Sequence, residues 1–446
     1  MVSVESAEQR PVRIVVRDDL TRSRLTVFFR LLLAIPLFIW VLLRGIAAFV
    51  VGFVNWLAVL IQAEVPDSLH DFVASYIRYS TQVGAYVFLA ANPYPWFRVQ
   101  PNYPVDIEID PPVRQGRWGG FFRLLLAIPA LLLATVLGGG FATGSSGQGS
   151  ATASSSGDQE AFWLNASSVG GVAAAAAFLA WFAIIARGNA PRGLRDLIAF
   201  TLGYAAQAGA YLFLLTPRYP TSDPALAEPY SELPEHPVRI VVNDDLDRPR
   251  LTVLFRLFLA IPHFIWLALW SIAAFFAVIV GWVLALVLGR LPDPLHRFLA
   301  AYVRYATHLF AFVYVIGRRF PGFTGRAGSY GIDVEIDPPT RQSRWKTVFR
   351  FFLSIPALIL ASALGGVALL IALLAWWYAL VTGRMPDGMR DLAAACLRYS
   401  AQAYGYLMLL TDRYPYGAPI LRARAHDEPV PMPMPSPAPP LVGDAF

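Results

Sequence analysis

The chain has 446 residues, of which 56% are hydrophobic and 15% are charged, and its formal net charge at pH 7 is +6. Soluble domains usually carry about 25% charged residues, whereas residues 257–288 contain no Asp, Glu, Lys or Arg. About 20 such residues suffice to cross a bilayer. The composition therefore excludes an ordinary soluble domain and predicts an all-α integral membrane protein.

The single cysteine, Cys396, excludes an intramolecular disulfide and a multi-cysteine metal cluster. The first ten residues lack the apolar segment of a signal peptide, so none is expected. Residues 12–16 (VRIVV) then alternate apolar and polar side chains, which predicts a β-strand. The acidic pair Asp18-Asp19 follows as a turn, and the nonapeptide FFRLLLAIP at 28–36 begins the first long apolar stretch.

This nonapeptide is the most visible part of an internal repeat. It recurs unchanged at 121–129, as LFRLFLAIP at 254–262 and as VFRFFLSIP at 348–356. The repeat divides the chain into four units with the same order of elements, namely 11–97, 104–220, 237–320 and 331–416. Units one and three match best, as do units two and four, which indicates that a pair of units was duplicated.

Each unit continues with an apolar stretch of about 35 residues, and we expect it to form a helical hairpin. A single helix of that length would measure over 50 Å, against a hydrocarbon core of about 30 Å. In unit two a Gly/Ser-rich insert, residues 138–160, splits the stretch, and insertions are tolerated in exposed turns. The hairpin turns of the other units are then expected at Arg44-Gly45, Ser271 and Gly365-Gly366.

A further helix closes each unit, and its place relative to the membrane has two interpretations. In unit one it spans residues 68–90 and carries Arg78 near its centre, which disfavours crossing the bilayer. An interfacial amphipathic helix, giving eight spans in total, is the preferred interpretation. Residues 197–215 of unit two carry no charge, which keeps an arrangement of twelve spans open.

The arginines predict the orientation. They flank the starts and ends of the long apolar stretches, whereas Arg44 is the one basic residue at the expected hairpin turns. Positive ends face the cytoplasm, so we expect a multi-pass cell-membrane protein with cytoplasmic termini and strands. The strands should pair as a small sheet, with Arg13 opposite Asp106. The Pro-rich residues 417–446 should form a disordered tail.

Two arginines six residues apart recur at the start of the apolar stretch in every unit. An arginine there can reach phosphate level and bind phosphate through two parallel hydrogen bonds. We therefore predict a belt for anionic lipid headgroups, while an alternative is that these arginines fix the topology and pair with acids such as Asp18 or Asp245. The eight residues are Arg24, Arg30, Arg117, Arg123, Arg250, Arg256, Arg344 and Arg350.

A proline follows six residues after the second arginine of each pair, at Pro36, Pro129, Pro262 and Pro356. Proline removes a backbone donor and frees the carbonyl four residues earlier, so each is expected to kink its helix and shape the packing. A broken-helix binding site, as in transporters, is the alternative. A Tyr-x-x-Gln-x-x-x-Tyr pattern on the closing helices, as at Tyr79, Gln82 and Tyr86, is expected to anchor these helices at the membrane interface.

The sequence favours a protein that is not an enzyme. His70 and His296 stand at helix starts where units two and four carry Arg195 and Arg390, so no catalytic role repeats with the units. No phosphate-binding loop, nucleophile elbow or set of metal-spaced His and Cys occurs, so no cofactor and no metal are expected. Basic residues alternate with acids beside the apolar stretches, which disfavours nucleic acid as a partner.

The motifs PVRIVV…DDL, RLTVFFRLLLAIP and LRYSAQAYGYLMLLTDRYP, in this order, resemble a family of bacterial membrane proteins known as domain of unknown function 4389. Four copies would cover residues 11–416. The resemblance implies a membrane location and a modular build, and no functional residues. We therefore expect a non-enzymatic module that binds membrane lipids or scaffolds partner proteins, and a transporter or channel with a path between the repeats is the alternative.

Overall fold

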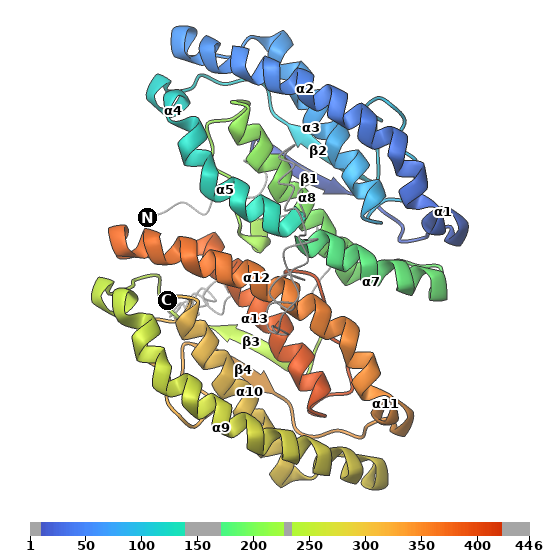
Figure 1. Cartoon of the computed structure of the whole chain (residues 1–446), viewed down its shortest axis with the longest axis vertical. Coiled ribbons are helices and arrows are strands. Elements are labelled where there is room, and N and C mark those ends of the chain that lie inside the picture. The colour runs from blue at the N-terminus through green and yellow to red at the C-terminus, as the bar shows by residue number, and fades with distance from the viewer. Residues whose placement is uncertain (1–9, 139–170, 227–233, 422–446) are drawn as a thin grey trace, which may run out of the picture.

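A computed structural model of the chain describes residues 10–138, 171–226 and 234–421 (Figure 1). Each repeat unit contributes one long apolar helix and one shorter second helix, which pack against each other in opposite directions. The long helices are α2 (Arg30–Gln62), α5 (Arg123–Gly138) with α7 (Gly171–Arg187), α9 (Arg250–Leu288) and α12 (Arg350–Thr382). The second helices are α3 (Asp67–Val87), α8 (Arg192–Leu212), α10 (Asp293–Val313) and α13 (Asp387–Leu407).

Shorter elements complete the units. The one-turn helices α1 (Arg24–Phe28), α4 (Arg117–Phe121) and α11 (Arg344–Val348) precede three of the long helices, while in unit three the same stretch is the first turn of α9. A 3₁₀ helix, η2 (Pro224–Leu226), lies between units two and three. The strands are β1 (Val12–Val16), β2 (Val105–Ile109), β3 (Val238–Val242) and β4 (Ile332–Ile336).

The predicted hairpin turn within the long apolar stretch is wrong in units one, three and four. Arg44-Gly45, Ser271 and Gly365-Gly366 all lie inside uninterrupted helices. Packing against the second helix explains this for unit one, because the Arg44 guanidinium donates to Ser75 Oγ at 2.7 Å and Gly45 leaves room for the Tyr76 hydroxyl. A lone glycine costs a helix only about 1 kcal/mol, which such contacts offset.

The turn of each unit lies at the end of the long helix instead. Four-residue loops, 63–66, 188–191, 289–292 and 383–386, join long and second helices. Each loop begins with a left-handed residue that ends the helix, Gly in three units and Ala63 in the first. Each loop also ends with a proline just before the second helix, a position that needs no backbone donor (Pro66, Pro191, Pro292 and Pro386).

Unit two carries its insert within the path of the long helix. Helices α5 and α7 have 16 and 17 residues, and together they match the 33 of α12. Figure 1 shows α7 continuing roughly in the direction of α5. Gly138 and Gly171, at the two ends, correspond to Gly365 and Gly366 of unit four. Residues 139–160 of the predicted flexible insert lie outside the described residues.

The second helices are interior elements and not interfacial ones, which corrects that prediction. Most residues of α8 and α13 are buried, and both helices belong to the main hydrophobic core together with residues of α3, α5, α7 and α12. Several polar residues of the second helices bind the strands and loops, while Asp67, Asp71 and Arg297 near the helix starts are exposed. The Arg78 side chain, for example, forms an ion pair with Asp106 of β2.

The strands form two antiparallel pairs, β1 with β2 and β3 with β4, so the predicted pairing between units is confirmed. The register places Arg13 opposite Glu108, not opposite Asp106. Arg13 lies 3.6 Å from Glu108 and 3.2 Å from Asp110, whereas Asp106 faces the helix layer and accepts from Arg78 and Gln82. The register explains the difference, because Asp106 lies opposite Val15, two residues further along β1 than Arg13.

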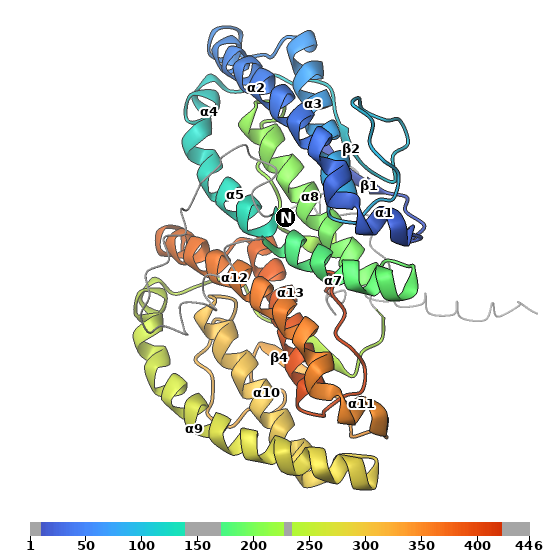
Figure 2. The same cartoon turned by 45° about the vertical axis from the view of Figure 1, so that its right-hand side comes forward.

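The long helices form one layer in the order α2, α5/α7, α12 and α9, with neighbours running in opposite directions (Figure 1). The second helices lie beneath them, and the strands pack on the second helices: β2 on α3, β1 on α8, β4 on α10 and β3 on α13. In Figure 2 the first strand pair lies on the far side of α3 from α2. The start of the predicted tail is packed, since Arg398 donates to the carbonyls of Tyr416 and Ala418; residues 422–446 are outside the described ranges.

Candidate functional site: an apolar helix face with an arginine rim

The long helices expose apolar side chains along their whole length. On α2 the exposed residues lie on the side facing away from α3, and Ile35, Ile46 and Phe49 are 50%, 58% and 73% exposed. The same pattern holds on α9 and α12, as at Phe275 and Leu369. Among the described helices, α2, α9 and α12 are long and apolar enough to cross a membrane. We call this surface the apolar face.

The second arginine of each pair is buried, which removes Arg30, Arg123, Arg256 and Arg350 from the predicted headgroup belt. Each is 1–4% exposed. Arg30 Nη1 donates to the carbonyls of Tyr86 and Ala91 at 2.8 and 2.9 Å, and its guanidinium stacks on the Tyr86 ring. In the other units the buried arginines stack in the same way on the rings of Tyr211, Phe312 and Tyr406. These arginines hold the end of the second helix against the start of the long helix.

A second set of side chains, which the sequence analysis missed in this role, completes this helix end. Two residues after the end of each second helix stands a non-glycine residue with positive φ: Leu89, Leu214, Val315 or Leu409. The carbonyl of this residue accepts from Arg22 Nε in unit one and from Gln115 Nε2 in unit two. Arg248 and Gln342 do the same in units three and four. The sequence contains a signal for this role, because each of these four residues stands eight positions before the buried arginine of its unit.

The first arginine of each pair is exposed and caps a long helix of the neighbouring unit. Arg24 donates to the carbonyl of Ala186 in unit two, and Arg117 donates back to Ile61 in unit one. Arg250 and Arg344 exchange the same contacts with Val381 and Val287 in the second half. A cation at a helix C-terminus complements the helix dipole. We call these four residues the arginine rim; their binding of headgroups stays a prediction.

Tryptophans accompany the rim. Trp118 and Trp345 directly follow Arg117 and Arg344, and their side chains are 79% and 77% exposed. Tryptophan and arginine together are typical of the boundary between hydrocarbon and headgroups. The ends of the apolar face therefore carry the residues expected at that boundary.

The prolines do not interrupt the helices. Pro36, Pro129, Pro262 and Pro356 all lie inside continuous helix, and the breaks in units one, two and four fall seven residues earlier, at Phe29, Phe122 and Phe349. The kink at the prolines stays a prediction.

The Tyr-x-x-Gln-x-x-x-Tyr residues do not anchor the helices at an interface, because they are buried. Tyr79 and Gln82 are 0% exposed. The Gln82 amide donates to the Gln100 carbonyl and accepts from the Gln100 N–H, and Gln207 and Gln402 accept from Thr221 and Tyr416 in the same way. The pattern fastens the loop that follows each second helix. In unit three, His308 takes the place of the glutamine and bonds to Asp333.

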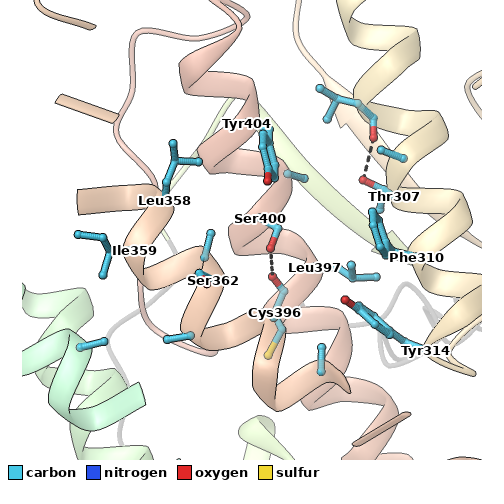
Figure 3. A pocket seen from close by; sticks show the side chains of 18 of the residues that line it. Thr307, Phe310, Tyr314, Leu358, Ile359, Ser362, Cys396, Leu397, Ser400 and Tyr404 are labelled. Carbon is cyan, nitrogen blue, oxygen red and sulfur yellow. Dashed lines mark hydrogen bonds between the residues drawn. The ribbon is translucent and has the colours of Figure 1, made fainter. Parts of the chain in front are cut away.

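A cavity of about 1010 Å³ lies between α10 and α13, beneath α9 and α12 and beside α7 (Figure 3). Most of its lining is apolar, and the hydroxyls of Thr307 and Ser400 bond to carbonyls of their own helices. Ile355 and Ile359 line it and are also 42% and 40% exposed, so the cavity is continuous with the apolar face. Burial raises the pKa of the Cys396 thiol in its wall to about 12, which leaves that thiol unreactive.

Most of the cavity lining comes from the second half of the molecule, and α7 of unit two supplies the rest. Phe310 and Tyr404 line it, and the aligned Tyr/Gln patterns place Gly84 and Gly209 at the same positions in the first half. There the Leu202 side chain packs onto Gly84, 2.8 Å from the position of an added Cβ. In the first half, α3 and α8 therefore pack directly at Gly84, whereas in the second half the larger side chains of Phe310 and Tyr404 line the cavity. Among the described residues, no group of three His, Cys, Asp or Glu is arranged to hold a metal ion.

Comparison with known proteins identifies one family. No curated protein and no solved structure matches the chain. The family model described as Domain of unknown function (DUF4389) matches residues 24–98, 161–222, 250–324 and 344–418. Three of the matches begin at a rim arginine, and all four end after the second helix of their unit, so the family domain follows the structural repeat. The chain thus belongs to the DUF4389 family and contains four tandem copies of its domain.

Proposed function

We propose that this protein is a non-enzymatic membrane module that binds lipid. The apolar face takes up hydrocarbon chains, and the arginine rim, Arg24, Arg117, Arg250 and Arg344, contacts anionic headgroups. A scaffolding role for partner proteins is compatible with this function. The distribution of arginines supports a place at the cell membrane with cytoplasmic termini.

The observation that carries the proposal is the extent of the apolar face. Monomeric soluble proteins rarely expose continuous apolar patches above a few hundred Å², and each Å² kept in water costs about 25 cal/mol. Here the exposed large side chains follow α2 from Leu31 to Ile61 and α9 from Leu251 to Leu288. Contact with lipid hydrocarbon removes that cost.

Vesicle binding tests the proposal. The purified protein should bind anionic vesicles more tightly than zwitterionic ones, and changing all four rim arginines to Gln should weaken anionic binding by about 1 kcal/mol per arginine. Binding to zwitterionic vesicles should persist, because the apolar face is intact. Arg17→Gln is the matched control, since Arg17 is exposed and directly follows β1.

Two results would contradict the proposal. Absence of vesicle binding by the parent protein would remove the membrane role altogether. Equal losses from Arg17→Gln and Arg24→Gln would show that the rim has no special part in headgroup binding. Because the rim arginines cap helices, thermal unfolding of each variant shows whether a loss of binding reflects unfolding.

The alternative function, a transporter or channel, has one supporting observation: the cavity lies where repeat units three and four meet. Its mostly apolar lining favours a hydrocarbon chain over an ion or a polar solute. Flux of a polar solute through vesicles containing the protein would establish this alternative.

A further inference from the structure

The layer order of the fold bears on how the apolar face meets the membrane. The strands do not extend beyond the ends of the helices; they pack over the middle of the second helices. Arg78, midway along α3, contacts Asp106 of β2, and Gly203, midway along α8, lies against Ile14 of β1. In the second half, Arg304 stands at the position of Arg78 and donates to the Val334 carbonyl of β4. Gln402 of α13, one turn after the position of Gly203, donates to the Val238 carbonyl of β3.

The outer face of the strands is charged. Arg13 and Glu108 have 33% and 51% of their side-chain surface exposed, and Arg239 and Glu335 have 32% and 54%. If the long helices crossed the bilayer, these ion pairs would lie near its midplane and face hydrocarbon. Ionised side chains are rare at that depth because they lose their hydration there.

The lengths of the long helices also argue against an orientation in which they span the bilayer. Helix α2 has 33 residues and α9 has 39, which correspond to about 50 Å and 58 Å. The hydrocarbon core is about 30 Å thick. The exposed apolar residues continue over nearly the full length of both helices, so a spanning orientation would push apolar side chains through both headgroup regions.

We propose that the four long helices lie parallel to the membrane plane within one leaflet, with the apolar face in the hydrocarbon and the charged strand pairs in water. This inference rests on the proposed function and adds its geometry. The partner is a single lipid leaflet, and the charge separation between the two faces of the molecule selects it. An orientation in the plane sets no limit on helix length and keeps every ion pair of the strands hydrated.

In this orientation no long helix spans the membrane, and the protein is attached to one leaflet as a monotopic membrane protein. Both ends of each long helix then lie on the same side of the membrane. The arginine rim, which joins the start of one long helix to the end of its neighbour, stays at one headgroup layer.

Spin-label depth measurements test the orientation. Ile35, Ile46 and Leu57 lie eleven residues apart on the exposed side of α2 and span about 33 Å along its axis. Each is changed to Cys in a Cys396→Ala background, labelled, and placed in anionic vesicles. Equal depths within the hydrocarbon are expected for all three labels, with a label at Glu108→Cys remaining in water.

The other outcomes are distinct. Depths that differ among the three labels by about the thickness of a leaflet, or a hydrocarbon environment at position 108, would overturn the in-plane orientation while leaving lipid binding intact. Three labels in water would overturn the proposed function itself. A membrane-impermeant maleimide should likewise label Ser23→Cys and Ser68→Cys, at opposite ends of α2, from one side of sealed vesicles; labelling from opposite sides would contradict the proposal.

Discussion

At the scale of single residues, one motif has two tasks that the sequence alone does not separate. The two arginines of each pair are chemically identical and six residues apart, yet one is exposed at the rim and the other is buried. The difference arises from tertiary contacts, because the buried arginine meets free carbonyls at the end of a helix over 50 residues away. Guanidinium groups suit this task, since one side chain satisfies several carbonyls.

The buried arginines differ in how fully they are satisfied. Arg350 donates to the carbonyls of Tyr406 and Thr411 and pairs with Asp412 at 2.8 Å. Arg256 donates to the carbonyl of Phe312, and its Nε and Nη2 find no hydrogen-bond partner among the described residues. Arg350→Gln should therefore lower the free energy of unfolding by more than Arg256→Gln, for which a loss of about 1–3 kcal/mol is expected.

Chemical unfolding in detergent, followed by tryptophan fluorescence, measures both changes. Rim variant Arg344→Gln is the control and should cost less than either, because its side chain is exposed. Equal losses at Arg256 and Arg350 would show that the extra hydrogen bonds and the Asp412 ion pair add nothing to stability.

At the scale of the elements, the helix ends follow local rules that the repeat makes visible. The long helices of units two, three and four end at Gly188, Gly289 and Gly383, whose φ angles are 73–79°. Unit one has Ala63 at the same position with φ 60°. An L-residue in this region costs about 1–2 kcal/mol, which glycine avoids.

Replacing Ala63 by Gly should therefore stabilise the protein by about 1 kcal/mol. The reverse change, Gly383→Ala, should destabilise it by a similar amount, and the two thermal unfolding midpoints should move in opposite directions. A loss of stability in Ala63→Gly would mean that the methyl group contributes more through packing than its backbone strain costs.

Sequence reasoning recovered the elements better than their ends. The repeat, the strands and their pairing follow from alternation and from the fourfold nonapeptide, which are local signals. The insert in unit two indicates an exposed hairpin turn, but its two ends, Gly138 and Gly171, lie in the path of a long helix. Arg78 and Gln82 indicate a solvent-facing side on the second helix of unit one, but their partners are β2 and its loop, which lie further along the chain.

At the scale of the whole molecule, the units interlock in pairs. The rim arginines of units one and two cap each other's long helices, and so do those of units three and four. The two halves then meet where α12 packs against α5 and α7. This arrangement explains why the chain repeats as a pair of pairs: a single unit leaves its helix ends without partners.

Helices α5 and α7 flank the insert of unit two and form the contact between the halves, so the effect of removing the insert can be predicted. Deleting residues 139–170 joins Gly138 to Gly171 and should give one continuous helix with the length of α12. The buried residues of α7, including Val172, Ala176 and Ile184, would keep the phase of the helix and still face the core. The variant should fold, bind vesicles like the parent and unfold at an equal or higher temperature, because chain closure costs less entropy.

A deletion one residue shorter, 139–169, is the matched control. The extra residue rotates α7 by about 100° relative to α5, which turns its buried alanines toward lipid and Phe178 and Phe182 toward the core. This variant should unfold at a lower temperature than the full deletion or lose α7 from the packed structure, as detected by proteolysis near Arg187. Equal stability of the two deletions would show that α5 and α7 are not two parts of one helical path, and the structural equivalence of unit two with unit four would fail with it.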